Sequence, residues 1–126
     1  MPRPVAVEQK ESLRKERRTK GQPFVGEKIR SRSTRCKLTS LMDVADLTRA
    51  GKSFTAVLEG SKNGVDWFLM AGFTWVSDPE NTDIPEIEIE SDVLRNLEVR
   101  SRIVVDDDLD LGMTITVEND GWQPQR

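Results

Sequence analysis

The sequence contains no histidine and no tyrosine, and it has a single cysteine, Cys36. Histidine is the commonest general base in enzymes, so its absence removes the usual catalytic pairs and triads. A lone cysteine without a histidine partner lacks the base that activates a thiol, and it provides neither an internal disulfide nor a zinc site. We therefore expect a protein that is not an enzyme and that carries no cofactor and no metal.

Long apolar runs are absent as well. No segment approaches the roughly 18 apolar residues that a membrane helix needs. The opening residues, Met1-Pro2-Arg3-Pro4, lack the apolar stretch of a signal peptide. We expect synthesis in the cytoplasm and no membrane partner.

Charge is abundant but unevenly distributed along the chain. Residues 1–37 carry 12 Lys and Arg against 4 Asp and Glu, a net charge of +8, whereas residues 38–126 carry 7 against 18, a net charge of −11. A division this sharp indicates a basic segment attached to an acidic domain. The whole-chain charge of −3 conceals it.

The basic segment lacks an apolar stripe. Residues 7–20 contain good helix formers but only two large apolar residues, Val7 and Leu13, so we expect disorder in the free protein. Residues 1–35 are therefore predicted to form an extended basic N-terminal arm that becomes ordered on a partner. The candidate partner-binding residues in this arm are its cationic and apolar side chains: Arg14, Lys15, Arg17, Arg18, Lys20, Phe24, Val25, Ile29, Arg30 and Arg32.

From residue 36 the hydrophobic pattern has a period of two, which is typical of strands with one buried face. Several such segments separated by loops predict an all-β fold, an antiparallel β-sandwich at residues 36–119, followed by a C-terminal tail at 120–126. The expected core side chains are Phe54, Leu58, Trp67, Leu69, Ile103, Ile115 and Val117.

One predicted hairpin has apolar residues on both faces. The turn at residues 60–64 contains Asn63-Gly64, which readily supplies a positive φ angle. In the returning strand Trp67 and Leu69 occupy one face, and Phe68 and Met70 occupy the other. A two-layer sandwich buries one face of each sheet, so Phe68 and Met70 are further candidate partner-binding residues.

Three other patterns allow functional interpretations that we weigh against simpler ones. Four aspartates within residues 106–110 provide hard oxygen ligands for calcium, but they lack EF-hand spacing, and a solvated hairpin tip is the better interpretation. Trp75 and Trp122 offer a carbohydrate platform, although core or interface packing is more common. The basic arm offers nucleic-acid binding, but Phe24 is its only aromatic residue and four glutamates interrupt it.

A hairpin of discoidin-like and jelly-roll β-sandwich modules resembles the segment Val57-Leu58-Glu59-Gly60-Ser61-Lys62-Asn63-Gly64-Val65-Asp66-Trp67. These modules include many small virion proteins of tailed bacteriophages. Residues 97–105 and 111–118 are similar to their paired final strands, so the resemblance covers about residues 53–118. The sequence departs from sugar-binding relatives because it lacks a recognisable set of exposed ligand residues.

The resemblance implies a non-enzymatic structural protein of the virion, either a capsid decoration or cement protein or a minor head protein. Its expected partner is the major capsid protein or another virion subunit, reached through the arm, in a homo-oligomer or multi-copy assembly. A carbohydrate-binding module and a nucleic-acid-binding protein are the alternatives.

Overall fold

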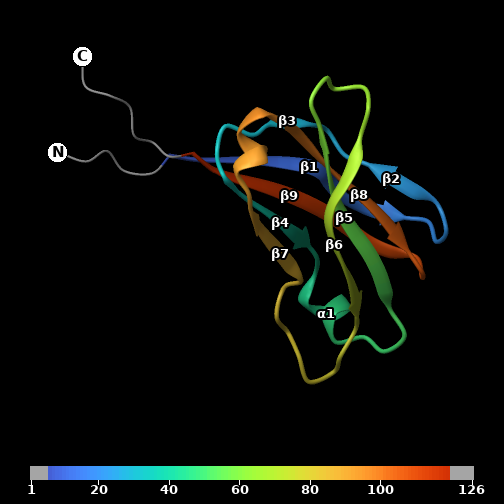
Figure 1. Ribbon diagram of the computed structural model, residues 1–126. Helices are drawn as coiled ribbons and strands as arrows, with labels where there is room; N and C mark the ends of the chain where they lie inside the picture. The colour runs from blue at the N-terminus through green and yellow to red at the C-terminus, as the bar shows by residue number, and fades with distance from the viewer. Residues whose placement is uncertain (1–5, 120–126) are drawn as a thin grey trace, which may run out of the picture.

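The structure is a computed structural model that describes residues 6–119, and nearly all of its regular secondary structure is strand (Figure 1). A short helix, α1 (Val44–Leu47), and a 3-10 turn, η1 (Asp92–Asn96), interrupt them. In the described part of the chain, no helix is long and apolar enough to cross a membrane. The strands are β1 (Ala6–Arg18), β2 (Pro23–Val25), β3 (Ile29–Arg30), β4 (Arg35–Leu41), β5 (Ser53–Ser61), β6 (Phe68–Val76), β7 (Glu86–Glu90), β8 (Glu98–Val105) and β9 (Leu109–Asn119).

The strands form two antiparallel sheets, one ordered β1-β9-β4-β7 and the other β2-β8-β5-β6, with β3 pairing to β8 beyond β2. Because β2 and β3 both pair with β8, they act as one interrupted strand. Counted in this way, the sheets have the orders 1-8-3-6 and 2-7-4-5, the eight-stranded arrangement of a jelly roll. The predicted fold class, an all-β antiparallel sandwich, is confirmed.

The core lies between the inner faces of the two sheets, where alternate residues of each strand meet. Five of the predicted core side chains are fully buried there. They are Phe54, Leu58, Ile103, Ile115 and Val117. Other buried members of the cluster include Leu38, Leu94, Leu97, Val99, Val105, Leu111 and Met113. Period-two alternation therefore predicted the inner faces of β5, β8 and β9 correctly.

Two predicted core residues, Trp67 and Leu69, lie outside the core. The pairing of β5 with β6 shifts register between Leu58 and Glu59, where β6 passes from Ala71 to Leu69 and Met70 is the extra residue. An extra residue in a strand reverses the face of the side chains on one side of it relative to those on the other side, here those before Met70 relative to those after it. Leu69 is consequently 67% exposed, and an alternation extended across the bulge assigns it to the wrong face.

The N-terminal segment is extended, as predicted, but from Ala6 onward it is part of the sandwich. β1 pairs with β9 along its length, and Leu13 is buried in the main core cluster (Figure 1). The prediction that residues 1–35 lie apart from the domain is therefore wrong for the described residues of that range. A sheet edge accepts a highly charged strand because most of its side chains stay in solvent while its backbone bonds to the neighbouring strand.

A polar seam joins β1 to the opposite sheet. The Ser101 hydroxyl donates to the Ser12 hydroxyl at 2.8 Å, and the Ser12 hydroxyl donates to the Glu27 carbonyl at 2.8 Å. The Glu27 amide in turn donates to the Ser12 carbonyl at 2.8 Å. Gly26 leaves the space for this contact, since a Cβ there would lie 2.7 Å from the Ser12 carbonyl oxygen. β1 thus closes one side of the sandwich.

Gly112 of β9 lies where the bulged part of β1 approaches most closely. A Cβ at this position would lie 2.6 Å from both the Leu13 carbonyl oxygen and the Lys15 amide nitrogen. These are backbone atoms, so we expect Gly112→Ala to lower the free energy of unfolding by about 2 kcal/mol or more. Thr114→Ala, on the same face of the same strand, is the control, with an expected change below about 1 kcal/mol. Equal effects in urea unfolding would contradict this close approach.

Candidate interaction surface

Several exposed cations of β1 bind acidic groups of the same molecule. Lys15 forms a hydrogen bond and ion pair with the Asp43 carboxylate, which raises the pKa of Lys15. Arg17 lies 3.7 Å from an Asp110 oxygen. The basic segment and the acidic remainder of the chain therefore attract each other within the molecule, and these ion pairs help to align β1 with the rest of the sandwich.

Arg18, predicted to bind a partner, is instead a buried structural residue, 4% exposed. Its Nε donates to the Leu111 carbonyl at 2.9 Å, and another guanidinium nitrogen donates to the Arg14 carbonyl. A third guanidinium nitrogen lies 3.0 Å from the Glu16 carboxylate. The guanidinium carbon lies 5.0 Å from the centre of the Phe24 ring. Arg18 and Phe24 together cover the core at the edge of β1.

The other predicted residues of the segment divide by exposure. Ile29 is half-buried and packs against the core, as Phe24 does. Those that remain exposed, besides Lys15 and Arg17, are Arg14, Lys20, Val25, Arg30 and Arg32.

A cavity of about 440 Å³ lies along β1 and brings three of the predicted residues together. These are Arg14, Arg18 and Val25, and Glu11, Glu16 and Glu27 line the same cavity. The carboxylates offset the positive charges, so this surface does not favour phosphate binding. The nucleic-acid alternative gains no support from it.

The aspartates of residues 106–110 have structural partners on different elements. The Ser53 hydroxyl donates to Asp106 at 2.7 Å, and the Lys20 amide donates to Asp108 at 2.9 Å. Within residues 6–119, no group of three or more acidic or cysteine side chains is placed to hold a metal ion. These contacts show how the tip between β8 and β9 is held to its neighbours.

A charged cluster on the outer face of the second sheet was missed by the sequence reasoning. Arg100 Nε donates to the Glu59 carboxylate at 2.9 Å, and Arg102 lies 3.9 Å from the same carboxylate. The Arg100 guanidinium also lies 4.0 Å from the centre of the Trp67 ring. Alternation of the two arginines in β8 was a usable signal, but placing Trp67 beside them required knowledge of the bulge.

Neither of the tryptophans proposed as a carbohydrate platform is shown in that role. Trp75 is half-buried against the core, with its ring centre 5.3 Å from that of Phe54. Trp122 lies outside the described residues. Trp75 is therefore a packing residue, and the remaining placed indole, Trp67, is engaged by Arg100.

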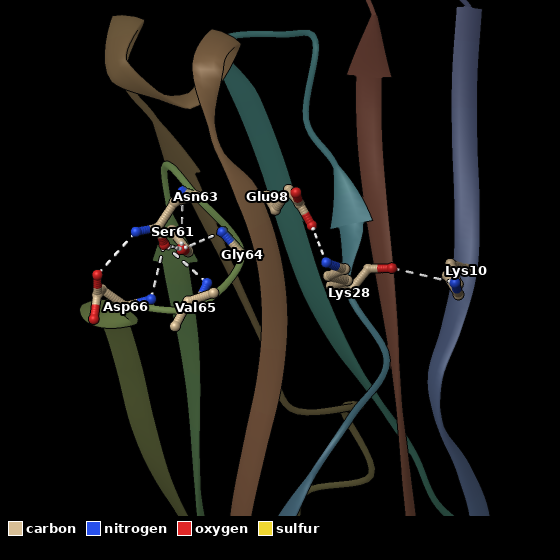
Figure 2. Close-up of polar contacts among 8 residues, drawn as sticks. All are labelled: Lys10, Lys28, Ser61, Asn63, Gly64, Val65, Asp66 and Glu98. Carbon is tan, nitrogen blue, oxygen red and sulfur yellow. Dashed lines mark hydrogen bonds and ion pairs between the residues drawn. The ribbon is translucent and has the colours of Figure 1, made fainter.

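The predicted turn between β5 and β6 is held by side-chain oxygens, as Figure 2 shows. The Asn63 side-chain oxygen accepts from the amides of Val65 and Asp66, each at 2.8 Å. The Ser61 hydroxyl accepts from the Gly64 amide at 2.8 Å, and Gly64 has a φ of 77°. These bonds define the loop and hold Val65 in solvent, where it is 75% exposed.

Exposed apolar side chains gather on this hairpin. Phe68 is 44% exposed and Leu69 is 67% exposed, and the exposed Val65 precedes them in the turn. Met70, the other predicted partner-binding residue of β6, is half-buried and packs against the core. We call Val65, Phe68 and Leu69, which lie at the turn end of β6, the hairpin patch, whereas Val76 lies at the opposite end of the strand, paired with Ser53. Large exposed apolar groups in one region of a surface mark interaction sites more often than scattered ones do.

Cys36 is buried, and burial raises the pKa of its thiol to about 12 from 9.0. The unfolded chain releases this proton above pH 9, whereas the folded protein retains it. The resulting stabilisation is complete below pH 9 and is lost as the pH rises towards 12. We expect wild type to lose more stability than Cys36→Val over this range in urea unfolding. Parallel pH profiles would contradict the burial of a neutral thiol.

In comparisons with known proteins, no protein-family model and no curated protein matches the sequence.

Proposed function

We propose that the chain is a non-enzymatic structural protein of a phage-like particle, either a capsid decoration or cement protein or a minor head protein. The observation that carries the proposal is the hairpin patch, in which three large apolar side chains are exposed within five residues at the start of β6. Exposing such side chains costs solubility unless a partner covers them. The jelly-roll topology supports the proposal because viral capsid domains use this architecture, although a fold by itself does not define a function.

The attachment is proposed to use the hairpin patch instead of a free arm. Residues 6–18 are committed to pairing with β9, so releasing them to reach another subunit would expose Leu13 and separate the buried Ser12–Ser101 contact. The hairpin patch is available without any rearrangement. Its partner would be the major capsid protein or another virion subunit, in an assembly that contains many copies.

The test is to purify the large complex that contains the tagged protein and to image it. We expect an ordered particle that carries the protein at repeated positions. The double variant Phe68→Ser/Leu69→Ser should be folded but absent from the particle. Val93→Ser is the matched control, because Val93 is an exposed apolar residue of η1, outside the hairpin patch. Recovery of the wild type only as free protein, or equal incorporation of all variants, would overturn the proposal.

A further inference from the structure

The four edges of the two sheets differ in how they are protected against pairing with another strand. β7 carries Glu86, Glu88 and Glu90 at alternate positions, and self-pairing would bring these glutamates together. β1 carries many charges and two register shifts, and the polar seam ties it to residues 26 and 27, which continue from the short edge strand β2. Charges, bulges and coverage are the usual means by which proteins block an edge.

β6 has less of this protection. It ends the order of its sheet, and its nine residues, Phe-Leu-Met-Ala-Gly-Phe-Thr-Trp-Val, include no charged residue and no proline. The bulge at Met70 interrupts only its beginning, and pairing with β5 is regular from Ala71 to Val76. Among the described strands, this is the edge best suited to accept a further strand.

Hydrogen bonding at the end of β6 identifies the backbone groups that face the open edge. The Ser77 amide donates to the Lys52 carbonyl at 2.8 Å, which makes these two residues a hydrogen-bonded pair. Hydrogen-bonded and non-hydrogen-bonded pairs alternate along an antiparallel ladder. The residues that direct both backbone groups away from β5 are therefore Gly72, Thr74 and Val76.

The contact between Thr55 and Thr74 agrees with this assignment. Their hydroxyl oxygens are 3.1 Å apart, as expected for a non-hydrogen-bonded pair, in which side chains lie closest. Thr74 is exposed and lies at the centre of the three residues that face outward.

We propose that β6 pairs with β6 of a second copy of the chain, antiparallel about a two-fold axis at Thr74, an inference that rests on the proposed function. In this register each Thr74 opposes the other, and Gly72 opposes Val76 of the second copy. All outward backbone groups of the regular stretch are then used, and the two sheets join into one. Opposed residues lie on the same face of a sheet, so the inner face of one copy continues into the inner face of the other.

A second copy suits this edge because a two-fold contact places each strand against itself. Such pairing is unfavourable for a strand with like charges, and β6 has none between Phe68 and Val76. The exposed side chain of Val76 would lie beside the partner strand and lose contact with water, which adds apolar burial to the backbone bonds.

The test uses the full 126-residue chain, with mass measured by light scattering after size-exclusion chromatography over a range of concentrations. We expect a wild-type dimer. Thr74→Lys and Thr74→Glu should each associate at least about tenfold more weakly, because the axis places like charges side by side. An equimolar mixture of the two variants should restore the dimer. Thr39→Lys, the same change on the outer face of β4, should remain dimeric.

The results separate this inference from the proposed function. A monomeric wild type, dimeric Thr74 variants or a mixture that stays monomeric would overturn pairing of β6 about Thr74. Dimer formation in the mixture also requires both variants to be folded, so it excludes misfolding as the cause of the weaker association of each variant alone. A wild type that is monomeric yet incorporated into a particle overturns only the pairing, whereas a β6-paired dimer found in no particle overturns only the particle function.

Discussion

Removal of residues 1–20 is expected to unfold the isolated protein. The truncation takes away all of β1, so β9 becomes an unprotected edge and the core loses Leu13. Truncating one buried leucine to alanine typically costs about 2–5 kcal/mol, and whole domains are stable by only about 5–15 kcal/mol. Loss of the strand pairing and of the buried Arg18 contacts adds to this cost. Circular dichroism and urea unfolding would measure it.

Leu13→Ala in the full-length chain provides the milder comparison, with an expected loss of about 2–4 kcal/mol and an unchanged fold. A synthetic peptide of residues 6–20 should restore structure to the truncated protein, because the missing strand is a single continuous segment. A truncated protein with the unfolding midpoint of the wild type would show that β1 contributes nothing to the sandwich. That result would instead support the prediction that the segment is an arm separate from the sandwich.

Arg18→Ala is expected to lower the free energy of unfolding by about 3 kcal/mol, whereas Arg17→Ala should change it by less than about 0.5 kcal/mol. The two arginines are neighbours in sequence but not in environment. Removal of Arg18 leaves the Leu111 and Arg14 carbonyls without their guanidinium donors and uncovers Phe24. Arg17 is largely exposed, and its contact with Asp110 is screened by water.

Urea unfolding of both variants at one pH and salt concentration would measure this difference. Arg18→Lys adds a second test, since a lysine keeps the charge but cannot place several donors in a planar fork. We expect it to recover less than half of the loss. Equal effects of Arg17→Ala and Arg18→Ala, or full recovery with lysine, would show that the buried hydrogen bonds of Arg18 are unimportant.

The regular parts of the sandwich were predictable because alternation directly reflects which side chains face the core. Phe54, Leu58, Ile103, Ile115 and Val117 are buried as the pattern predicts. The pattern assigned Trp67 and Leu69 wrongly because one extra residue at Met70 reverses the phase, and no local sequence signal marks that bulge. The exposure of Leu69 followed from the same reversal.

The sequence alone determined the all-β class of this protein, the turn at Asn63-Gly64 and most of its core, because strand periodicity and turn chemistry are properties of neighbouring residues. Only the tertiary structure decided that β1 belongs to the sandwich and that Arg18 is buried while Arg17 is not. The physical reason is that a charged strand gains its stability from β9, more than ninety residues away in the chain, and not from its own composition. Pairing over that separation also brings the positive and negative parts of the chain together.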